Sequence, residues 1–516
     1  MTACQEFILV GRRSFVLGSM MAAIAASAGS AADAPPIIRV RDGLVRGRRS
    51  DAALAFTGIP FAEPPMGALR FCPPRRPRPW SGILDATRPA NVPPQDLDPA
   101  LPQTAPISED CLQLNVWAPR APGPHPVFVW IYGGGNSSGS ISLPPYQGES
   151  FARDGIVFVS CNYRVGVLGF LELGDITGAE QRGSGNNALR DLILALEWVR
   201  ANIAAFGGDA TNITLGGQSA GAWNCAALMA LPPAQGLFHR CILASGGADM
   251  VHTPESAGEF ARQFVSRLGG EQRLRSAPIA DLLQAQAEAK LDSTNPIPFR
   301  AVVDGNFLTA KPIELLRRGN ARSITTMVGH THDESRYLMT PAQADSPAAS
   351  KLLMHLDPSR LPGVMDAYQR ASPGSSRGET MLRILSADLI GIPALRIAEA
   401  QVASGARTYY YDLRYAIPSG PFGPYSAHGI DVPLIFELTD TSFARTVFGY
   451  SLADRAMASA VHGTWVSFIK TGHPGGMLPV WPPYDLVERP TMSIDAHSSV
   501  SKDPTKEERV IWANLV

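Results

Sequence analysis

The chain lacks what a nucleic-acid-binding or membrane-spanning protein needs. Its 516 residues include 45 lysines and arginines against 46 acidic residues, so the formal net charge is −1, and no basic run stands out. Nucleic acid is therefore not an expected partner. After the N-terminal region, no apolar run reaches the ~20 residues of a membrane-spanning helix, and no internal repeat is present. We expect a globular protein without a stable membrane anchor.

Cysteine is scarce as well, with six in the whole chain. No Cys/His cluster has metal-ligand spacing, so the sequence predicts neither a metal site nor another cofactor. If the N-terminal segment that contains Cys4 is removed, five remain: Cys72, Cys111, Cys161, Cys225 and Cys241. An odd number requires a free thiol or an intermolecular pair. Cys161 and Cys225 lie in apolar patterns that are typical of buried thiols.

The N-terminus carries the pattern of an export signal. Arg12-Arg13 precedes an apolar run that continues to Ala28 and ends in small residues. This pattern predicts a twin-arginine signal peptide over residues 1–32, cleaved after Ala28 or Ala32, and a periplasmic or secreted protein. Because the run is short for a membrane span, an uncleaved anchor is disfavoured.

A candidate nucleophile lies in Gly217-Gln218-Ser219-Ala220-Gly221, directly after the apolar run 213–215. A G-x-S-x-G pattern between a strand and a helix is typical of a nucleophile elbow, in which a sharp turn exposes the serine hydroxyl. The glycines allow a turn too tight for side chains. Ser219 would lie at a helix N-terminus, where backbone N–H groups stabilise developing negative charge.

Acyl transfer by Ser219 also requires donors for the oxyanion. The buried-strand pattern 127–131 leads into a glycine triplet that includes Gly134 and Gly135. Their backbone N–H groups, with that of Ala220, are the expected donors. A flexible turn is the alternative, and the serine motif downstream argues against it.

The general base must come from ten histidines. His428 lies in a loop of small residues downstream of both the serine and the candidate acids. Asp333 and Glu334 follow a short strand pattern, and spacing alone does not decide which of them orients the histidine. The order serine, acid, histidine is that of α/β-hydrolases.

Strand and helix patterns alternate along the chain and predict a mostly parallel sheet with helices on both faces, an α/β fold. Because Ser219, Glu334 and His428 must meet, we expect residues 33–516 to form a single domain, with the helical region 340–380 as a lid or cap. The predicted helices span 189–206 and 222–231, and the predicted strands span 127–131, 157–161, 213–215, 241–244, 325–328 and 408–411.

From about Ile38 to the C-terminus the chain resembles the type-B carboxylesterases, the family that includes the cholinesterases. The resemblance rests on several motifs in one order, among them Phe56-Thr57-Gly58-Ile59-Pro60, Glu109-Asp110-Cys111, Trp130-Ile131-Tyr132-Gly133-Gly134-Gly135, Asn162-Tyr163-Arg164-Val165-Gly166 and Val303-Asp304-Gly305. It implies an α/β-hydrolase fold and ester hydrolysis through Ser219, Glu334 and His428. It also implies that Gly134, Gly135 and Ala220 bind the oxyanion, and that Ser245 supports the acid–histidine pair.

The chain departs from the family at two informative places. Gln218 stands where the family commonly has glutamate, which removes a negative charge beside the serine. Residues 93–108 contain no aromatic side chain, so the cation–π site of a cholinesterase is missing. The family's first disulfide also lacks its usual upstream cysteine, where Pro93 stands, and Cys72 is the alternative partner for Cys111.

The expected substrate pocket contains a mixed set of residues, namely Asn136, Gln218, Asn295, Ile297, Arg300, Arg336 and Tyr337. We hypothesise that Arg300 and Arg336 clamp a small-molecule ester whose acid part carries further carboxylates; surface salt bridges are the competing interpretation for both. Fumonisin-type esterases, which release tricarballylate from an aminopolyol toxin, are family members with such a substrate.

The competing hypotheses for the whole chain are an amidase, a lactonase, a polyester hydrolase and a non-catalytic adhesion protein. The intact triad and glycines argue against adhesion.

Overall fold

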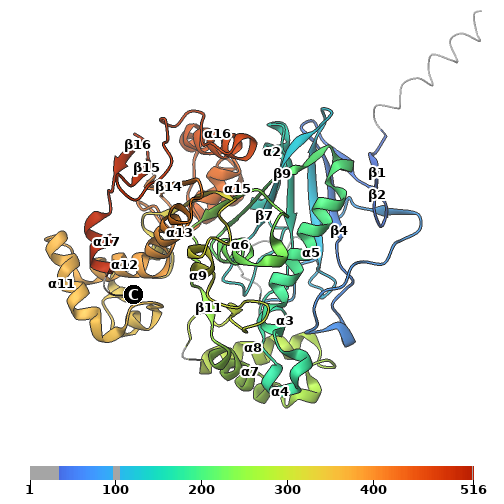
Figure 1. Ribbon diagram of the computed structural model, residues 1–516, viewed down its shortest axis with the longest axis horizontal. Helices are drawn as coiled ribbons and strands as arrows, with labels where there is room; N and C mark the ends of the chain where they lie inside the picture. The colour runs from blue at the N-terminus through green and yellow to red at the C-terminus, as the bar shows by residue number, and fades with distance from the viewer. Residues whose placement is uncertain (1–33, 97–104, 294, 514, 516) are drawn as a thin grey trace, which may run out of the picture.

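The computed structural model describes residues 34–96, 105–293, 295–513 and 515, and a large mixed sheet forms its centre (Figure 1). Along this 11-stranded sheet the order is β16-β15-β14-β13-β10-β9-β7-β8-β6-β4-β3. The strands from β15 to β8 are parallel to their neighbours, whereas β16, β6, β4 and β3 pair antiparallel. The predicted α/β-hydrolase fold is confirmed.

Each strand predicted from the sequence is present, with longer bounds in several cases. In sheet order the strands are β16 (Ser499–Lys502), β15 (Pro490–Ile494), β14 (Thr408–Leu413), β13 (Thr325–Thr331), β10 (Arg240–Ala244), β9 (Gly208–Gln218), β7 (His125–Ile131), β8 (Val157–Cys161), β6 (Gln113–Pro119), β4 (Ala53–Pro60) and β3 (Arg48–Arg49). Two smaller sheets contain β1 (Ile37–Val40), β2 (Gly43–Arg46) and β5 (Ile83–Asp85), and β11 (Val251–His252) and β12 (Ala301–Val302).

Helices cover both faces of the large sheet, because alternate side chains of each buried strand point to opposite faces. In β7, Val127, Val129 and Ile131 pack in one apolar cluster with residues of α5, α6 and α13. Phe128 and Trp130 pack in another with residues of α2, α14 and α16. The helices of these layers are α2 (Glu149–Arg153), α5 (Asn187–Asn202), α6 (Ala220–Ala230), α13 (Ile392–Ala403), α14 (Asp431–Ile435) and α16 (Arg455–Thr471).

The other helices belong to excursions from this core: α3 (Val167–Phe170), α4 (Gly174–Thr177), α7 (Pro254–Leu268), α8 (Ile279–Asp292), α9 (Pro312–Arg317), α10 (Pro341–Ala344), α11 (Leu361–Ala371), α12 (Arg377–Ser386), α15 (Ser442–Phe448) and α17 (Lys506–Ala513). The predicted helical region 340–380 thus contains α10, α11 and the start of α12. In Figure 1 these helices lie at one end of the molecule beside α17. They share a small apolar cluster with Trp512 of α17.

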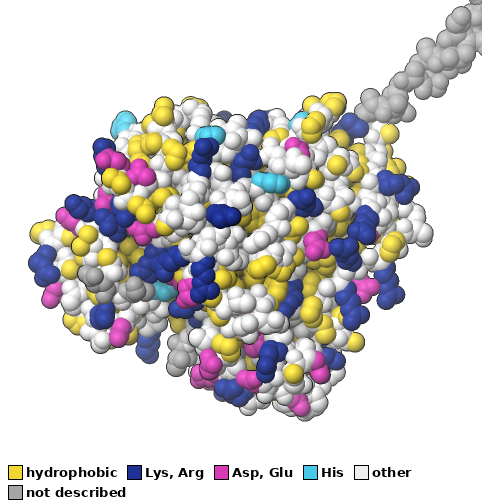
Figure 2. Space-filling view, in the orientation of Figure 1, with side chains coloured by type: hydrophobic (Ala, Val, Ile, Leu, Met, Phe, Trp, Pro, Cys, Tyr) yellow, Lys and Arg dark blue, Asp and Glu magenta, His cyan; other side chains and the backbone are white. Residues whose placement is uncertain are grey.

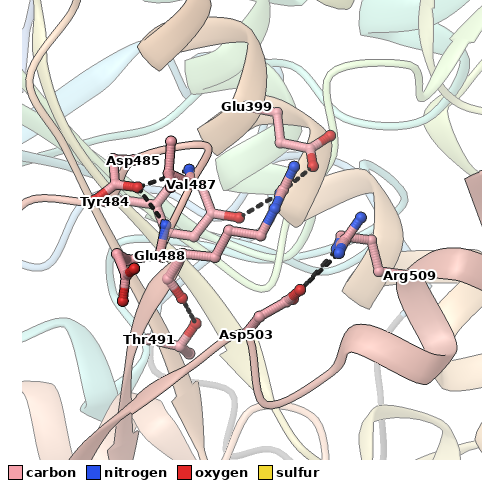
Figure 3. A network of polar contacts seen from close by, with 9 residues as sticks. Glu399, Tyr484, Asp485, Val487, Glu488, Thr491, Asp503 and Arg509 are labelled. Carbon is pink, nitrogen blue, oxygen red and sulfur yellow. Dashed lines mark hydrogen bonds and ion pairs between the residues drawn. The ribbon is translucent and has the colours of Figure 1, made fainter.

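Polar contacts hold the C-terminal segment against α13 and the end of the sheet (Figure 3). Asp503 pairs with Arg509 at 2.6 Å, across the start of α17. Arg489 donates to Glu399 of α13 at 2.5 Å and to the Tyr484 hydroxyl at 2.9 Å. These contacts fix the position from which α17 begins.

The cysteines do not pair as the sequence suggested. All five in the described part of the chain are free thiols, so the hypothesised Cys72–Cys111 disulfide is not formed. Cys111 is fully buried, and burial raises the pKa of its thiol. The Cys72 thiol instead contacts the Ala68 carbonyl and Gln181. As expected, Cys161 and Cys225 are buried thiols.

The predicted signal peptide lies outside the described residues. Within the ranges that are described, every helix is too short or too polar to cross a lipid bilayer.

Candidate active site

The serine motif forms a tight turn between β9 and α6. Ser219 adopts φ 57° and ψ −128°, a strained backbone conformation for a residue other than glycine. A side chain at position 217 would place its Cβ 2.6 Å from the backbone of Gly221, and a side chain at Gly221 would collide with the Ile131 carbonyl of β7. Close packing therefore requires glycine at both positions. The turn places Ser219 beyond the end of β9, directly before α6.

The candidate catalytic residues lie after neighbouring strands of the sheet. In the order β14, β13, β10, β9, β7, the loops that follow carry His428, Glu334, Ser245, Ser219 and the glycine triplet. The carboxyl ends of parallel strands meet at one edge of a sheet, which is where α/β proteins bind ligands. Sheet topology therefore gathers residues that are far apart in the sequence.

The acid and the base form a close pair. His428 Nδ1 donates to Glu334 Oε2 at 2.5 Å, and Glu334 Oε1 accepts the Thr331 N–H at 2.8 Å. Asp333 points elsewhere, since its carboxylate accepts the Ser426 N–H at 3.0 Å. This choice between Asp333 and Glu334, which spacing left open, is made by the direction of the two side chains.

Electrostatics favour a charged acid beside a basic imidazole. Burial by itself raises the pKa of Glu334, but the charge and hydrogen bond of His428 outweigh it and lower that pKa. Burial likewise lowers the pKa of His428, and the charge and hydrogen bond of Glu334 reverse this and raise it. The Ser245 hydroxyl also lowers the pKa of Glu334, although it is buried without a well-formed hydrogen bond among the described residues.

The expected oxyanion donors lie where the sequence placed them. Gly134 and Gly135 line the cavity that contains Ser219, and both have positive φ, at 110° and 62°. Ala220 is the first residue of α6. In the described part of the chain, the amides of these residues donate no hydrogen bond to another protein group. They remain free for a ligand oxygen.

Ser219, Glu334 and His428 border one cavity of about 420 Å³, a size typical of small-molecule sites. Most of the remaining wall is apolar and comes from Trp223, Met250, Ile297, Leu338, Leu352, Leu389 and Ile390. Leu338 and Leu352 flank or belong to the helical region 340–380, so part of that region covers one side of the site. Tyr337 stacks on the His428 ring with centroids 4.8 Å apart.

Comparison with known proteins agrees with this geometry. A model of the Carboxylesterase family matches residues 34–512. The chain belongs to the carboxylesterase family. It is 32% identical to the para-nitrobenzyl esterase of Bacillus subtilis over 92% of this chain and 97% of that protein. It is 31% identical to the phenmedipham hydrolase of Pseudarthrobacter oxydans over 92% and 98%.

Solved structures agree with the family assignment. A carboxylesterase of Geobacillus stearothermophilus superposes with a TM-score of 0.81 at 34% identity, covering 92% of this chain and 99% of that one. A thermophilic para-nitrobenzyl esterase reaches a TM-score of 0.84 at 31% identity over 93% and 100%. This carboxylesterase is therefore an ester hydrolase by family and fold.

Four of the pocket residues expected from the sequence do not line the pocket of this carboxylesterase. Asn136 is buried, where it donates to the Phe299 carbonyl and accepts from Asn224. The Asn295 side chain accepts the Ile297 N–H within its own turn. These two asparagines shape the loops and do not face a ligand.

The arginine clamp is the clearest error. Arg300 is 8% exposed, and its Nη2 lies 3.4 Å from His252 Nδ1. Burial lowers the pKa of Arg300 to about 10. Arg336 pairs with Glu379 and lies over the Tyr425 ring, 3.6 Å from its centroid. It lines a different cavity, and neither arginine is among the residues that line the cavity beside Ser219.

Sequence reasoning missed a basic residue that does line the pocket. Lys290, in the last turn of α8, is exposed and borders the cavity near Ile297. Apart from His428, it is the sole basic side chain among the described lining residues. Its signal was weak, because a lysine near a helix C-terminus is ordinarily a solvated charge.

A second missed group is Asp431, three residues after His428. It is fully buried, and neither carboxylate oxygen has a hydrogen-bond partner among the described residues. Burial, and then the charge of Glu334, raise the pKa of Asp431 to about 7. Burial therefore favours the protonated form of this carboxyl more than that of an exposed aspartate.

Gln218 lines the pocket as expected, and it also contacts the candidate base. Its side-chain Nε2 lies 3.2 Å from His428 Nε2, the ring nitrogen opposite Glu334. An amide can donate to a neutral imidazole, or turn and accept from an imidazolium. A carboxylate at this position could only accept, and would favour the charged ring.

We expect Gln218→Glu to move the acid limb of the kcat/KM profile to higher pH by about one unit or more. The new carboxylate would raise the pKa of His428, so that a higher pH would be needed to populate the neutral base. The measurement is the pH dependence of p-nitrophenyl acetate hydrolysis, with Gln218→Met as a neutral control of similar size. An acid limb that is the same in Gln218→Glu and wild type would show that the side chain does not face the titrating base.

Proposed function

We propose that this carboxylesterase hydrolyses carboxylic esters through a Ser219–His428–Glu334 triad and an acyl-enzyme intermediate. The observation that carries the proposal is the meeting of four parts at one cavity. These are a strained serine at a helix N-terminus, a buried acid–imidazole pair, free backbone amides and an apolar wall. Such a set supports acyl transfer, with one contact still to form: among the described residues it is Gln218 Nε2, and not Ser219 Oγ, that lies within hydrogen-bond distance of His428 Nε2.

In the first half-reaction, His428 Nε2 takes the Ser219 proton as Oγ forms a bond to the ester carbonyl carbon. Gln218 must move off Nε2 for this step. Glu334 holds Nδ1–H, which fixes the tautomer, and stabilises the imidazolium. The carbonyl oxygen becomes an oxyanion that accepts from the amides of Gly134, Gly135 and Ala220, where loss of one donor costs roughly 10²–10³ in rate.

The C–O bond to the alcohol then breaks, and His428 returns the proton to the leaving alkoxide. In the second half-reaction, water replaces the alcohol. His428 takes a proton from water as its oxygen attacks the acyl carbon, and the proton returns to Ser219 Oγ as the acid leaves. The chain's own groups account for every proton in this cycle.

The proposal can be tested by labelling with a fluorophosphonate, which phosphonylates an activated serine. We expect one equivalent per chain, located on Ser219 by mass spectrometry, with complete loss of p-nitrophenyl ester hydrolysis. Matched ester and anilide substrates of the same acyl group distinguish an esterase from an amidase. Labelling at another residue, or anilide turnover as fast as ester turnover, would contradict the proposal.

We further propose that the substrate carries a negative charge on the side that faces Lys290. Among the described residues that line the pocket, Lys290 is the one exposed cation, and no acid competes with it because Gln218 is neutral and Glu334 is paired with His428. Among the described residues, Lys290 forms no salt bridge. An ester with further carboxylates fits this charge, and a fumonisin-type toxin with tricarballylate esters is such a compound.

We expect Lys290→Gln to raise KM for a p-nitrophenyl hemisuccinate about 1.4- to fivefold, because an exposed charge pair contributes roughly 0.2–1 kcal/mol. KM for the neutral butyrate should change less than this. Both values are measured by initial rates at low ionic strength, and added salt should shrink the difference. The exposed Lys311, which does not line the pocket, provides the matched control Lys311→Gln. Equal changes for both esters would remove the charge argument and leave the esterase proposal intact.

A further inference from the structure

A second cavity of about 400 Å³ lies next to the candidate active site and has no part in the proposed reaction. Its wall comes from β13, the end of β14, the segments around residues 333–336 and 382–391, and the start of α17. The volume is close to that of the substrate pocket and is sufficient for a small organic molecule. In contrast to that pocket, this cavity is bordered largely by polar and charged side chains.

Two hydrogen-bonded segments separate the cavities. In the 3₁₀ turn Glu334–Tyr337, Ser335 and Arg336 face the second cavity, whereas Glu334 and Tyr337 face the substrate pocket. The π-helical turn Ala387–Gly391 is divided in the same way, because its two ends face the second cavity and its middle faces the pocket. Ser335 N–H donates to Ser386 Oγ at 3.0 Å and joins the two segments. The cavities are thus neighbours with a common wall.

A buried carboxylate orients two basic groups of the second cavity. Asp412 is 1% exposed, and its Oδ2 lies 3.2 Å from His332 Nδ1 and 2.8 Å from Arg414 Nε. Burial lowers the pKa of His332, but the hydrogen bond and charge of Asp412 outweigh it and raise that pKa. In the described part of the chain, His332 Nε2 and the two terminal nitrogens of Arg414 have no hydrogen-bond partner. Both groups therefore keep donors for a ligand.

Further basic groups come from other segments around the same cavity. Lys506 begins α17 and has no salt bridge among the described residues, and Arg383 extends from α12 to contact Ser372 Oγ at 2.5 Å. Figure 2 shows basic side chains gathered on this part of the surface, near α12 and the chain's C-terminal helix. The contact between Asp503 and Arg509 in Figure 3 holds the segment that leads into α17.

The acids of the cavity are mostly engaged with other groups. Asp333 accepts from the Ser426 amide, and Glu508 accepts from the Tyr368 hydroxyl at 2.6 Å. Glu507 is the third acid of the lining and is exposed, and Arg336 of the lining is paired with Glu379 outside it. The donors that remain free face the cavity from several sides, so they suit a ligand with more than one negatively charged group.

We propose that this second cavity binds a small polycarboxylate anion. One carboxylate would bind between His332 and Arg414, whose guanidinium can donate two parallel hydrogen bonds. A second would bind toward Lys506 and Arg383. A carbon skeleton that spaces its carboxylates reaches both places, whereas a single inorganic anion reaches one. The site is separate from Ser219, so its occupation does not depend on the proposed esterase activity.

The test is calorimetric titration of the full chain with citrate, at constant ionic strength, after Ser219 has been blocked by a fluorophosphonate or replaced by alanine. We expect one citrate per chain, with acetate and inorganic phosphate at least tenfold weaker. Lys506→Gln and Arg383→Gln should each weaken citrate several-fold, and Lys290→Gln should not. Both side chains are exposed and neither contacts Asp412, so we expect both variants to fold.

Arg414→Lys provides a further check, because lysine keeps the positive charge beside Asp412 but lacks the planar guanidinium that donates two parallel hydrogen bonds to a carboxylate. We expect citrate binding to fall at least tenfold, with the melting temperature in the absence of citrate taken as the measure of folding. Three results would overturn the proposal: no citrate binding, citrate binding that only Lys290→Gln weakens, and phosphate binding as tight as citrate.

Discussion

Ser219→Ala should reduce kcat for p-nitrophenyl butyrate by roughly 10⁵–10⁶-fold, close to the loss that removal of a triad serine causes in other hydrolases. Without Oγ no acyl-enzyme forms, and the oxyanion donors and the pocket can only assist direct attack by water. Residual hydrolysis above the uncatalysed rate is expected for that reason. The measurement is kcat and KM on one purified preparation, with the fluorophosphonate adduct counted in parallel.

The substitution should leave the fold intact, so that the loss can be assigned to chemistry. Ser219 Oγ has no hydrogen bond within the described part of the chain. Like serine, alanine has a Cβ, so the conformation at φ 57° is as strained for alanine as it is for serine. Ser276→Ala, at an exposed serine that does not line the cavity, is the matched control. If Ser219→Ala kept activity within tenfold of wild type, another nucleophile would have to carry the reaction.

The elements that the sequence predicted well are those that chain order and local geometry determine. The glycines around Ser219 require a strand, a sharp turn and a helix, and the structure contains β9, the turn and α6 in that order. The glycine triplet after β7 is equally local. His428 was predicted as the base because small residues surround it, because it follows both the serine and the candidate acids, and because the family resemblance implies it.

Side-chain direction is what the sequence could not supply. Asp333 and Glu334 are adjacent, and it is their hydrogen bonds that show the difference: the first accepts from the Ser426 N–H and the second pairs with His428. Arg300 and Arg336 are close in sequence to Ile297 and Tyr337, which do line the pocket. Each arginine nevertheless turns away from the pocket, toward His252 in one case and Glu379 in the other.

The remaining differences between prediction and structure come from packing between segments that are distant in the sequence. The family resemblance suggested Cys72 as a partner for Cys111, but Cys111 is enclosed in the core while Cys72 turns toward Gln181. Lys290 borders the pocket together with Trp223 and Leu389 from distant segments, a tertiary arrangement that no local pattern contains. The second cavity likewise arises where β13, α12 and α17, three distant segments, come together.

Glu334→Gln is the variant for which we expect the second-largest effect, a fall in kcat of roughly 10⁴-fold with little change in KM. The amide can still accept the Thr331 N–H, so the loop should keep its shape. Its other face, however, presents an N–H to His428 Nδ1, which favours the tautomer whose Nε2 carries a proton. That ring cannot accept the Ser219 proton, and no charge remains to stabilise the imidazolium.

The same substitution should also move the acid limb of the residual activity to lower pH, opposite to the shift expected for Gln218→Glu. Glu334 raises the pKa of His428 through its charge and hydrogen bond, so removing the charge lowers that pKa and keeps the ring neutral in more acidic solution. Asp333→Asn is the neighbouring control, because an amide oxygen can still accept the Ser426 N–H. If Asp333→Asn caused the larger loss, or if the acid limb of Glu334→Gln moved to higher pH, the assignment of Glu334 as the acid that orients His428 would be wrong.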